Sequence, residues 1–290
     1  MKRIKRTLAA LLIVVLTLAL LGEAVFADNS EQPVWPEEGA IQLSKSAAAV
    51  EGKENTWEVT LGIQGKNYKT TSDVVLVIDN SNSMYPSKTS KEDRMTKTKA
   101  AANAFVDTLL TEDSTTRIAL VVYNLKETHT GFYAYANRAA LKQQINAIEQ
   151  NEDEGGTFTQ LGLHTARTLL NSAESTGQNK SIVLLSDGEP TASYRIGGSI
   201  TCTEDIEFTD YTFFFGVTKY ATSNINWATA QINCNYNKVD GNGEEFVTDA
   251  ASGLEITGCK HASDGGDDYI THGIATIWES NQAKADGTTI

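Results

Sequence analysis

Residues 74–83 read Val-Val-Leu-Val-Ile-Asp-Asn-Ser-Asn-Ser, and this stretch decides the fold. The apolar run 74–78 is typical of a strand buried on both faces, as in a parallel sheet with helices on either side. In such sheets ligands bind beyond the carboxyl ends of the strands. Asp79, Ser81 and Ser83 stand at that position, and their carboxylate and hydroxyl oxygens suit a hard cation. The stretch therefore predicts a cation site at a strand end.

Apolar strands and amphipathic helices alternate along the chain after this first strand. Two more buried strands are predicted at 117–123 and 180–187, and a short edge strand at 130–135. Apolar residues recur at helical spacing in 94–110, 137–150, 160–173 and 270–278. The alternation predicts the α/β fold class, with a doubly wound, mostly parallel sheet flanked by helices.

The first 72 residues lack the alternation of buried strands and helices and are interpreted as two separate segments. Residues 1–27 combine a basic start with the apolar run 8–21 and small residues before position 28, which predicts a signal peptide. An uncleaved membrane anchor is the alternative, but the run is shorter than the ~20 residues of a spanning helix. Residues 28–72 are interpreted as an acidic leader and a β-segment, because apolar and polar residues alternate from Trp57 to Ile63. We expect a secreted chain with no membrane insertion after signal cleavage.

The charge of the chain narrows the classes of partner. Its 37 Asp and Glu residues outnumber 24 Lys and Arg, for a formal net charge of −13. Loss of the basic signal peptide makes the remainder more acidic still. Nucleic acids and anionic membranes both require basic patches on a protein. The charge therefore argues against nucleic acid and membrane partners, and fits an extracellular protein that handles cations.

The alternation of strand and helix breaks from 191 to 268. This segment contains all three cysteines of the chain, Cys202, Cys234 and Cys259. A structureless loop of that length is improbable inside a compact domain, so we predict a β-rich insertion. One disulfide is expected in an exported protein. The sequence leaves three pairings open, with one thiol left over in each.

Two further loops complete the candidate site. Thr157 follows Gly155-Gly156 just before a helix, and Asp187 ends the third buried strand. Together with the first turn they give the set Asp79, Ser81, Ser83, Thr157 and Asp187. This order resembles the metal-ion-dependent adhesion site of the von Willebrand factor type A (vWA) domain. The alternative, that these residues only cap turns, explains one loop but not three.

The resemblance covers residues 73–290 apart from the insertion, and it implies a domain that is incomplete at its C-terminus. It also implies that Ser81 and Ser83 bind a metal through their hydroxyls, and that Asp79, Thr157 and Asp187 bind directly or through water. Such oxygens select Mg²⁺ first, with Mn²⁺ and Ca²⁺ also suited. Five side chains cannot fill an octahedral ion, so one position is expected to accept a carboxylate from a partner.

We therefore expect an exported cell-surface adhesion module that binds a host or matrix protein, or a neighbouring surface subunit, through an Asp or Glu carboxylate on the metal. The alternative is a metal-stabilised structural or assembly subunit of a pilus or surface fibre. The insertion and the β-segment resemble Gram-positive surface and pilus-tip adhesins, which implies a cell-wall or pilus location. An enzyme is not expected, because Ser81 stands where an aspartyl phosphatase needs a second carboxylate.

Other polar residues have simpler interpretations. His129 and His164 are interpreted as surface or packing residues, and Asp153 and Glu154 as a solvated loop rather than an acidic rim of the site. The insertion leaves the sheet just after Asp187, so we expect its root beside the metal face. There it would shape the surface that a partner meets.

Overall fold

The computed structural model describes residues 41–53, 55–65, 70–87, 90–151, 155–213, 215–241, 247–249, 253–259 and 269–290. The predicted signal peptide, the leader as far as residue 40, and Asp153 and Glu154 lie outside these residues. The chain divides into two compact units, 1–68 and 69–290, which are described separately. Among the described residues, no helix is both long and apolar enough to cross a membrane.

The first unit contains a single described hairpin. Strands β1 (Ile41–Ala49) and β2 (Trp57–Gly65) pair antiparallel, with Leu43 opposite Ile63 and Ala49 opposite Trp57. This pairing confirms the alternation seen in the sequence and gathers the large apolar side chains on one face. Six of them are more than half exposed: Ile41, Leu43, Trp57, Val59, Leu61 and Ile63.

The second unit is built on a four-stranded sheet in the order β5-β4-β3-β6. Its strands are β3 (Ser72–Asp79), β4 (Thr116–Tyr123), β5 (Glu127–His129) and β6 (Asn179–Leu185). The central strand β3 runs parallel to both β4 and β6, and β5 is antiparallel to β4. The chain end adds a parallel bridge from Thr289 to Ser181 on the other side of β6. The mostly parallel sheet is confirmed.

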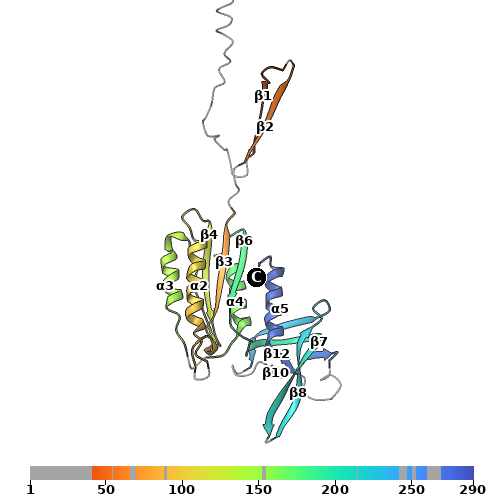
Figure 1. Cartoon of the computed structure of the whole chain (residues 1–290). Helices are drawn as coiled ribbons and strands as arrows, with labels where there is room; N and C mark the ends of the chain where they lie inside the picture. Colours follow the sequence, from red (N-terminus) through yellow and green to blue (C-terminus); the bar gives the residue numbers. More distant parts are fainter. Residues whose placement is uncertain are drawn as a thin grey trace, which may run out of the picture. The chain divides into compact units, whose positions relative to one another are not determined.

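Helices cover both faces of this sheet (Figure 1). The four are α2 (Arg94–Leu109), α3 (Arg138–Asn146), α4 (Thr159–Asn171) and α5 (His272–Ala285). On one face Leu76 and Ile78 pack with α2 and α3, and on the other Val75 and Val77 pack with α4 and α5. Helix α4 lies close because it has Gly162, where a Cβ would come within 2.6 Å of the Tyr123 ring. An unbroken apolar strand is the sequence signature of this double burial.

One predicted element is displaced. The edge strand expected at 130–135 is instead β5 at Glu127–His129, followed by an isolated antiparallel bridge from Tyr133 to Ile118. The Thr130 hydroxyl accepts the Leu120 N–H at 3.0 Å and thereby replaces a backbone acceptor. The alternating pattern is therefore present, but a side chain interrupts the ladder. The following helix begins with a short 3-10 turn, Tyr135–Asn137.

The insertion forms a second sheet, which we call the arm. Its strands are β7 (Ser193–Phe213), β8 (Phe215–Ile225), β9 (Gln231–Asp240), β10 (Val247–Asp249), β11 (Leu254–Thr257) and β12 (Tyr269–Thr271). They pair in the order β10-β12-β8-β7-β11, with β9 also on β7. The arm has its own apolar core, which includes Ile274 and Ala275 of α5. A β-rich insertion is confirmed, and its last strand lies just past the predicted limit at 268.

The disulfide of the arm joins Cys202 to Cys259, and Cys234 is a half-buried free thiol. The bond links strand β7 to the turn after β11, 57 residues apart. Burial raises the pKa of the Cys234 thiol to about 11, so this cysteine is protonated and unreactive at neutral pH.

We expect the double variant Cys202→Ser/Cys259→Ser to lose about 2–4 kcal/mol of stability in the arm, because the closed loop no longer restricts the unfolded state. Hydrogen exchange should accelerate in β7, β8 and β11 while β3 and β4 keep their protection. The control is Cys234→Ser, which removes a thiol but no covalent bond. Equal acceleration in the arm and in the central sheet would contradict the prediction.

Candidate functional site

The site begins where β3 ends. Asp79 is fully buried there, and its Oδ1 accepts the Ser81 N–H at 2.8 Å. Its other oxygen accepts the hydroxyl of Ser186, which follows β6, at 2.6 Å. These bonds fix the carboxylate between the two parallel strands. Because β3 and β6 run in the same direction, their carboxyl ends meet at one edge of the sheet, as expected from the sequence.

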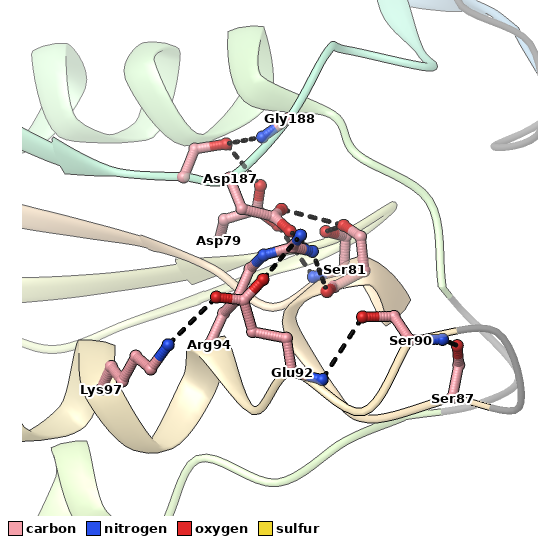
Figure 2. Close-up of polar contacts among 11 residues, drawn as sticks. Asp79, Ser81, Ser87, Ser90, Glu92, Arg94, Lys97, Asp187 and Gly188 are labelled. Carbon is pink, nitrogen blue, oxygen red and sulfur yellow. Dashed lines mark hydrogen bonds and ion pairs between the residues drawn. The ribbon is translucent and has the colours of Figure 1, made fainter.

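A chain of hydroxyl contacts leads from Asp79 to Asp187. After Asp79 the backbone turns through a short 3-10 helix, Asn82–Met84, and this turn brings Ser81 and Ser83 to the same side. Their hydroxyl oxygens lie 3.0 Å apart, and the Ser83 hydroxyl donates to Asp187 Oδ1 at 2.9 Å. Figure 2 shows the carboxylates and hydroxyls converging above the strand ends. Four of the five predicted residues therefore lie in one continuous cluster.

The fifth residue, Thr157, is placed beside the cluster by its loop. Among the described residues its side chain has no hydrogen bond to the other four. The Asn82 N–H donates to the Gly155 carbonyl at 3.0 Å, which ties the Thr157 loop to the serine turn. A Cβ on Gly155 would lie 1.8 Å from the amide of the Asn82 side chain, so a larger residue there would require this side chain to move. Thr157 itself is 6% exposed.

Thr191, at the root of the arm, holds the Thr157 loop from the other side. Its hydroxyl accepts the Thr157 N–H at 2.9 Å, and its own N–H donates to the Thr157 carbonyl at 2.8 Å. One turn further on, the Gln160 side-chain carbonyl accepts the Tyr194 N–H at 2.8 Å. The arm therefore fixes the loop that presents Thr157.

We expect Thr191→Val to weaken metal binding roughly tenfold, as happens when a group that orients a ligand is lost. Valine keeps the shape of threonine but leaves the Thr157 N–H without its acceptor. The measurement is Mg²⁺ titration by calorimetry, and Thr191→Ser, which keeps the hydroxyl, is the control. Equal affinity of the valine variant and the wild type would show that Thr191 has no influence on the site.

Arg94 belongs to the cluster, and the sequence interpretation missed it. Its Nη1 donates to Asp187 Oδ2 at 2.7 Å (Figure 2). The same atom donates to the Ser83 carbonyl at 2.9 Å. Asp93 caps helix α2 by accepting the Thr96 N–H, which sets the start of the helix and so the place of Arg94. A basic residue in the first turn is unfavourable for the helix dipole. A basic residue at the start of a predicted helix was therefore the sequence feature that could have pointed to Arg94.

The electrostatics of the cluster favour a cation. Burial raises the pKa of the Asp79 carboxyl, and the nearby charge of Asp187 raises it further, although hydrogen bonds from Ser186 and Ser81 oppose the rise. Arg94 reaches Asp187, but no ion pair to Asp79 exists among the described residues. A buried carboxylate without an opposite charge is costly, and a divalent cation beside it removes that cost.

The donor set fits a hard metal ion. Two carboxylates and three hydroxyls are oxygen ligands of the kind that Mg²⁺, Mn²⁺ and Ca²⁺ accept. Within the described part of the chain, no cluster of three or more His, Cys, Asp and Glu side chains gathers. Sites for softer metals such as zinc are built from such clusters. The assignment of Asp79, Ser81, Ser83, Thr157 and Asp187 as metal ligands stays a prediction.

The other polar residues singled out from the sequence lie elsewhere. His129 pairs with Glu127 at 2.9 Å on the edge strand β5. His164 stacks on Tyr236 with ring centroids 4.0 Å apart and contacts the buried Glu279 at 3.2 Å. Both positions agree with surface or packing roles, and His164 joins helix α4 to the arm.

Comparison with known proteins gives a consistent result. A family model described as "von Willebrand factor type A domain" matches residues 73–231. The chain is 34% identical over 184 residues to the minor fimbrium subunit Mfa5 of Porphyromonas gingivalis. This alignment covers 60% of this chain and 14% of that protein. The chain therefore spans a small part of the length of this relative.

Solved structures share the fold at low sequence identity. The vWF domain of the type V pili tip protein Mfa5 aligns with a TM-score of 0.52 and 22% identity, over 77% of this chain and 80% of that one. The pilus adhesin SpaC from Lactobacillus rhamnosus GG, in its open conformation, aligns with a TM-score of 0.52 and 21% identity. That alignment covers 92% of this chain and 29% of the SpaC chain.

Proposed function

This chain belongs to the von Willebrand factor type A domain family, and we propose that it is an exported adhesion module that binds a protein partner through a divalent metal. Members of this family often bind such a metal at the site that the five predicted ligands resemble. The similarity to a fimbrial subunit and to the fold of pilus-tip adhesins supports a pilus adhesin or subunit role at the cell surface.

One observation carries the proposal: the cluster at the carboxyl ends of β3 and β6 offers a metal two carboxylates and several neutral hydroxyls. Such a cation keeps some electrophilic character, because only two carboxylates face it and neutral hydroxyls supply its other protein oxygens. When bound, Mg²⁺ would attract a further carboxylate as a Lewis acid. Ser83 and Gly188 are exposed at this edge, so a partner's Asp or Glu can reach it.

Arg94 suits a site that alternates between two states. In the structure its guanidinium neutralises Asp187, with Nη1 2.7 Å from Oδ2. A bound cation would take over this role, since both positive groups compete for one carboxylate. Ser83 and Asp187 would then hold the metal together with the other predicted ligands. One coordination position of the metal would be left to the partner's carboxylate.

The residues at the site suit binding better than enzymatic chemistry. An aspartyl phosphatase would need a second carboxylate two residues after Asp79, where Ser81 stands. The half-buried Cys234 is protonated at neutral pH and so is a poor nucleophile. We propose that the site binds rather than transforms its ligand.

Chelation tests the proposal. The chain, immobilised on a sensor, is exposed to a panel of matrix proteins (fibrinogen, fibronectin and type I collagen) in Mg²⁺ and then in EDTA. Binding to at least one of them should disappear in EDTA and in the Asp187→Asn variant. The control is Asp113→Asn, which makes the same change at an exposed loop position. Binding that is equal in Mg²⁺, in EDTA and in Asp187→Asn would refute the metal bridge.

A structural or assembly role is the second candidate, and the name of the fimbrial relative favours it. In that case the partner carboxylate comes from a neighbouring subunit. Purified chain that binds pilin subunits in Mg²⁺, but no matrix protein, would identify this role.

A further inference from the structure

Arg94 makes three polar contacts beside the candidate site, and only one of them is to a carboxylate of the predicted ligand set. That contact joins Nη1 to Asp187 Oδ2 at 2.7 Å. The same Nη1 donates to the backbone carbonyl of Ser83 at 2.9 Å. Nη2 lies 3.2 Å from Glu92 Oε2 (Figure 2). The Ser83 carbonyl and Glu92 would therefore keep the guanidinium beside the site whatever Asp187 binds.

Glu92 does not cancel the charge of Arg94, because it is shared with a second basic residue. Lys97 Nζ lies 3.0 Å from Glu92 Oε1 (Figure 2). The side chains of Glu92 and Lys97 are 46% and 71% exposed, so solvent screens this outer pair. The Asp187 side chain is only 10% exposed. The positive charge of Arg94 therefore acts mainly on the inner carboxylates.

Arg94 changes the charge balance of the inner cluster. When both are ionised, Asp79 and Asp187 carry two negative charges, and Arg94 offsets one of them. The cluster without metal is then left with one net negative charge. A divalent cation would turn this into one net positive charge, and a partner's carboxylate would bring the sum to zero. Without Arg94 the loaded cluster would already be neutral before the partner arrives.

A positive charge at this place has opposite effects on the two binding events, since it disfavours a cation and favours an anion. We propose that Arg94 makes the binding of the metal and the binding of the partner's carboxylate mutually dependent. Arg94 keeps the affinity for the metal low until a carboxylate joins it, and then serves as the counter-charge of that carboxylate. This role rests on the proposed function above.

The same charge makes Arg94 a specificity-determining residue. A carboxylate and a carboxamide are alike in shape, and both present an oxygen that accepts hydrogen bonds. Only the carboxylate neutralises the net positive charge that Arg94 leaves on the loaded cluster. Arg94 therefore increases the preference of the site for Asp and Glu over Asn and Gln.

Calorimetric titration of the whole chain with Mg²⁺ tests this role, in chloride alone and with acetate or acetamide added at equal ionic strength. Acetate stands for the partner's carboxylate, and acetamide is its neutral analogue. In the wild type, acetate should tighten Mg²⁺ binding more than acetamide does. Arg94→Gln should bind Mg²⁺ in chloride roughly tenfold more tightly, since a neighbouring charge changes the proton affinity of a carboxylate by about one to three powers of ten. Acetate should then tighten Mg²⁺ binding less than in the wild type, because the two ligands are linked reciprocally.

Two variants serve as controls. Arg94→Lys keeps the positive charge and should stay close to the wild type in both titrations. Arg138→Gln removes the same charge from the first residue of α3, where the guanidinium stacks on Tyr135, and should change neither titration. Thermal unfolding in EDTA checks the fold of Arg94→Gln. Its Tm should fall by at most about 4 °C, because the Arg94 side chain in the lost ion pair is 37% exposed.

The outcomes separate this role from the proposed function. Arg94→Gln with Mg²⁺ affinity equal to or below that of the wild type would overturn the role of Arg94 and leave the metal bridge intact. An acetate effect as large in Arg94→Gln as in the wild type, or Arg94→Lys behaving like Arg94→Gln, would also overturn it. No Mg²⁺ binding to the wild type, or Mg²⁺ binding that acetate does not tighten, would contradict the metal bridge and, with it, the role of Arg94.

Discussion

Replacing Asp79 by asparagine should have two opposite effects: metal affinity falls by at least about 100-fold, while the metal-free protein becomes more stable. The carboxylate is fully buried, and burial raises its pKa, which means that the folded state disfavours its charge. Asparagine has the same shape, accepts the Ser81 N–H with its carbonyl, and carries no charge. The stability gain should be complete above the raised folded pKa, shrink as the pH falls below it, and be gone below the unfolded pKa of about 3.9, where the wild type is neutral in both states.

Two measurements check this result. Calorimetric titration with Mg²⁺ gives the affinity, and thermal unfolding in EDTA gives the change in Tm. Asp187→Asn is the comparison, because Asp187 is paired with Arg94 and its replacement should remove metal binding without the gain in stability. A lower Tm of Asp79→Asn in EDTA would mean that the hydrogen bonds of the carboxylate outweigh its burial, and the cost assigned to the unpaired charge would be wrong.

Asp73→Asn should destabilise the protein by about 3 kcal/mol, although it makes the same chemical change six residues earlier on the same strand. The Asp73 side chain is 1% exposed and receives Arg117 through two bonds, Nε at 2.9 Å and Nη2 at 2.7 Å. The hydroxyl of Ser175 and the N–H of Gly177 donate to it as well. Asparagine breaks the two-bond pair and leaves the Arg117 guanidinium without its counter-charge.

The effect of Asp73→Asn should depend on pH. Burial raises the pKa of Asp73, but the bonds from Arg117, Gly177 and Ser175 outweigh it and hold the pKa below its ordinary value. The stability from this carboxylate is therefore complete above the unfolded pKa of about 3.9 and is lost as the pH falls through the lower folded value. Urea unfolding at neutral pH and near pH 3 measures the difference.

The control for this series is Asp113→Asn at an exposed position, which should change the free energy of unfolding by less than about 0.5 kcal/mol. A loss at Asp73 that is constant from neutral to acidic pH would show that packing, and not the charge pair, sets the cost.

The central sheet could be predicted from the sequence because local pattern and tertiary environment agree there. An apolar run such as 74–78 is stable only with cover on both faces, and the structure provides that cover. The position of the site followed from the same logic, since parallel strands end at one edge. The edge strand was misplaced because the Thr130 hydroxyl, a side-chain acceptor, substitutes for backbone pairing.

Contacts between distant segments could not be predicted. Arg94 reaches Asp187 across 93 residues, and Thr191 reaches Thr157 across 34. Neither pair leaves a periodic pattern, because each is made by a single side chain whose direction depends on tertiary packing. The Cys202–Cys259 pairing is of the same kind: spacing alone left three pairings open, and the path of β7 beside β11 decides between them.

The position of β3 between two parallel neighbours has a mechanical consequence. Tension applied at Ser72 against a partner held beyond Asp79 would run along the length of this strand. Both ladders, to β4 and to β6, extend over nearly its whole length, so such a pull loads their hydrogen bonds in shear and all of them together. Bonds loaded in parallel resist far more force than bonds opened one at a time. The strand that leads into the Asp79 turn therefore resists such a pull with both of its ladders at once.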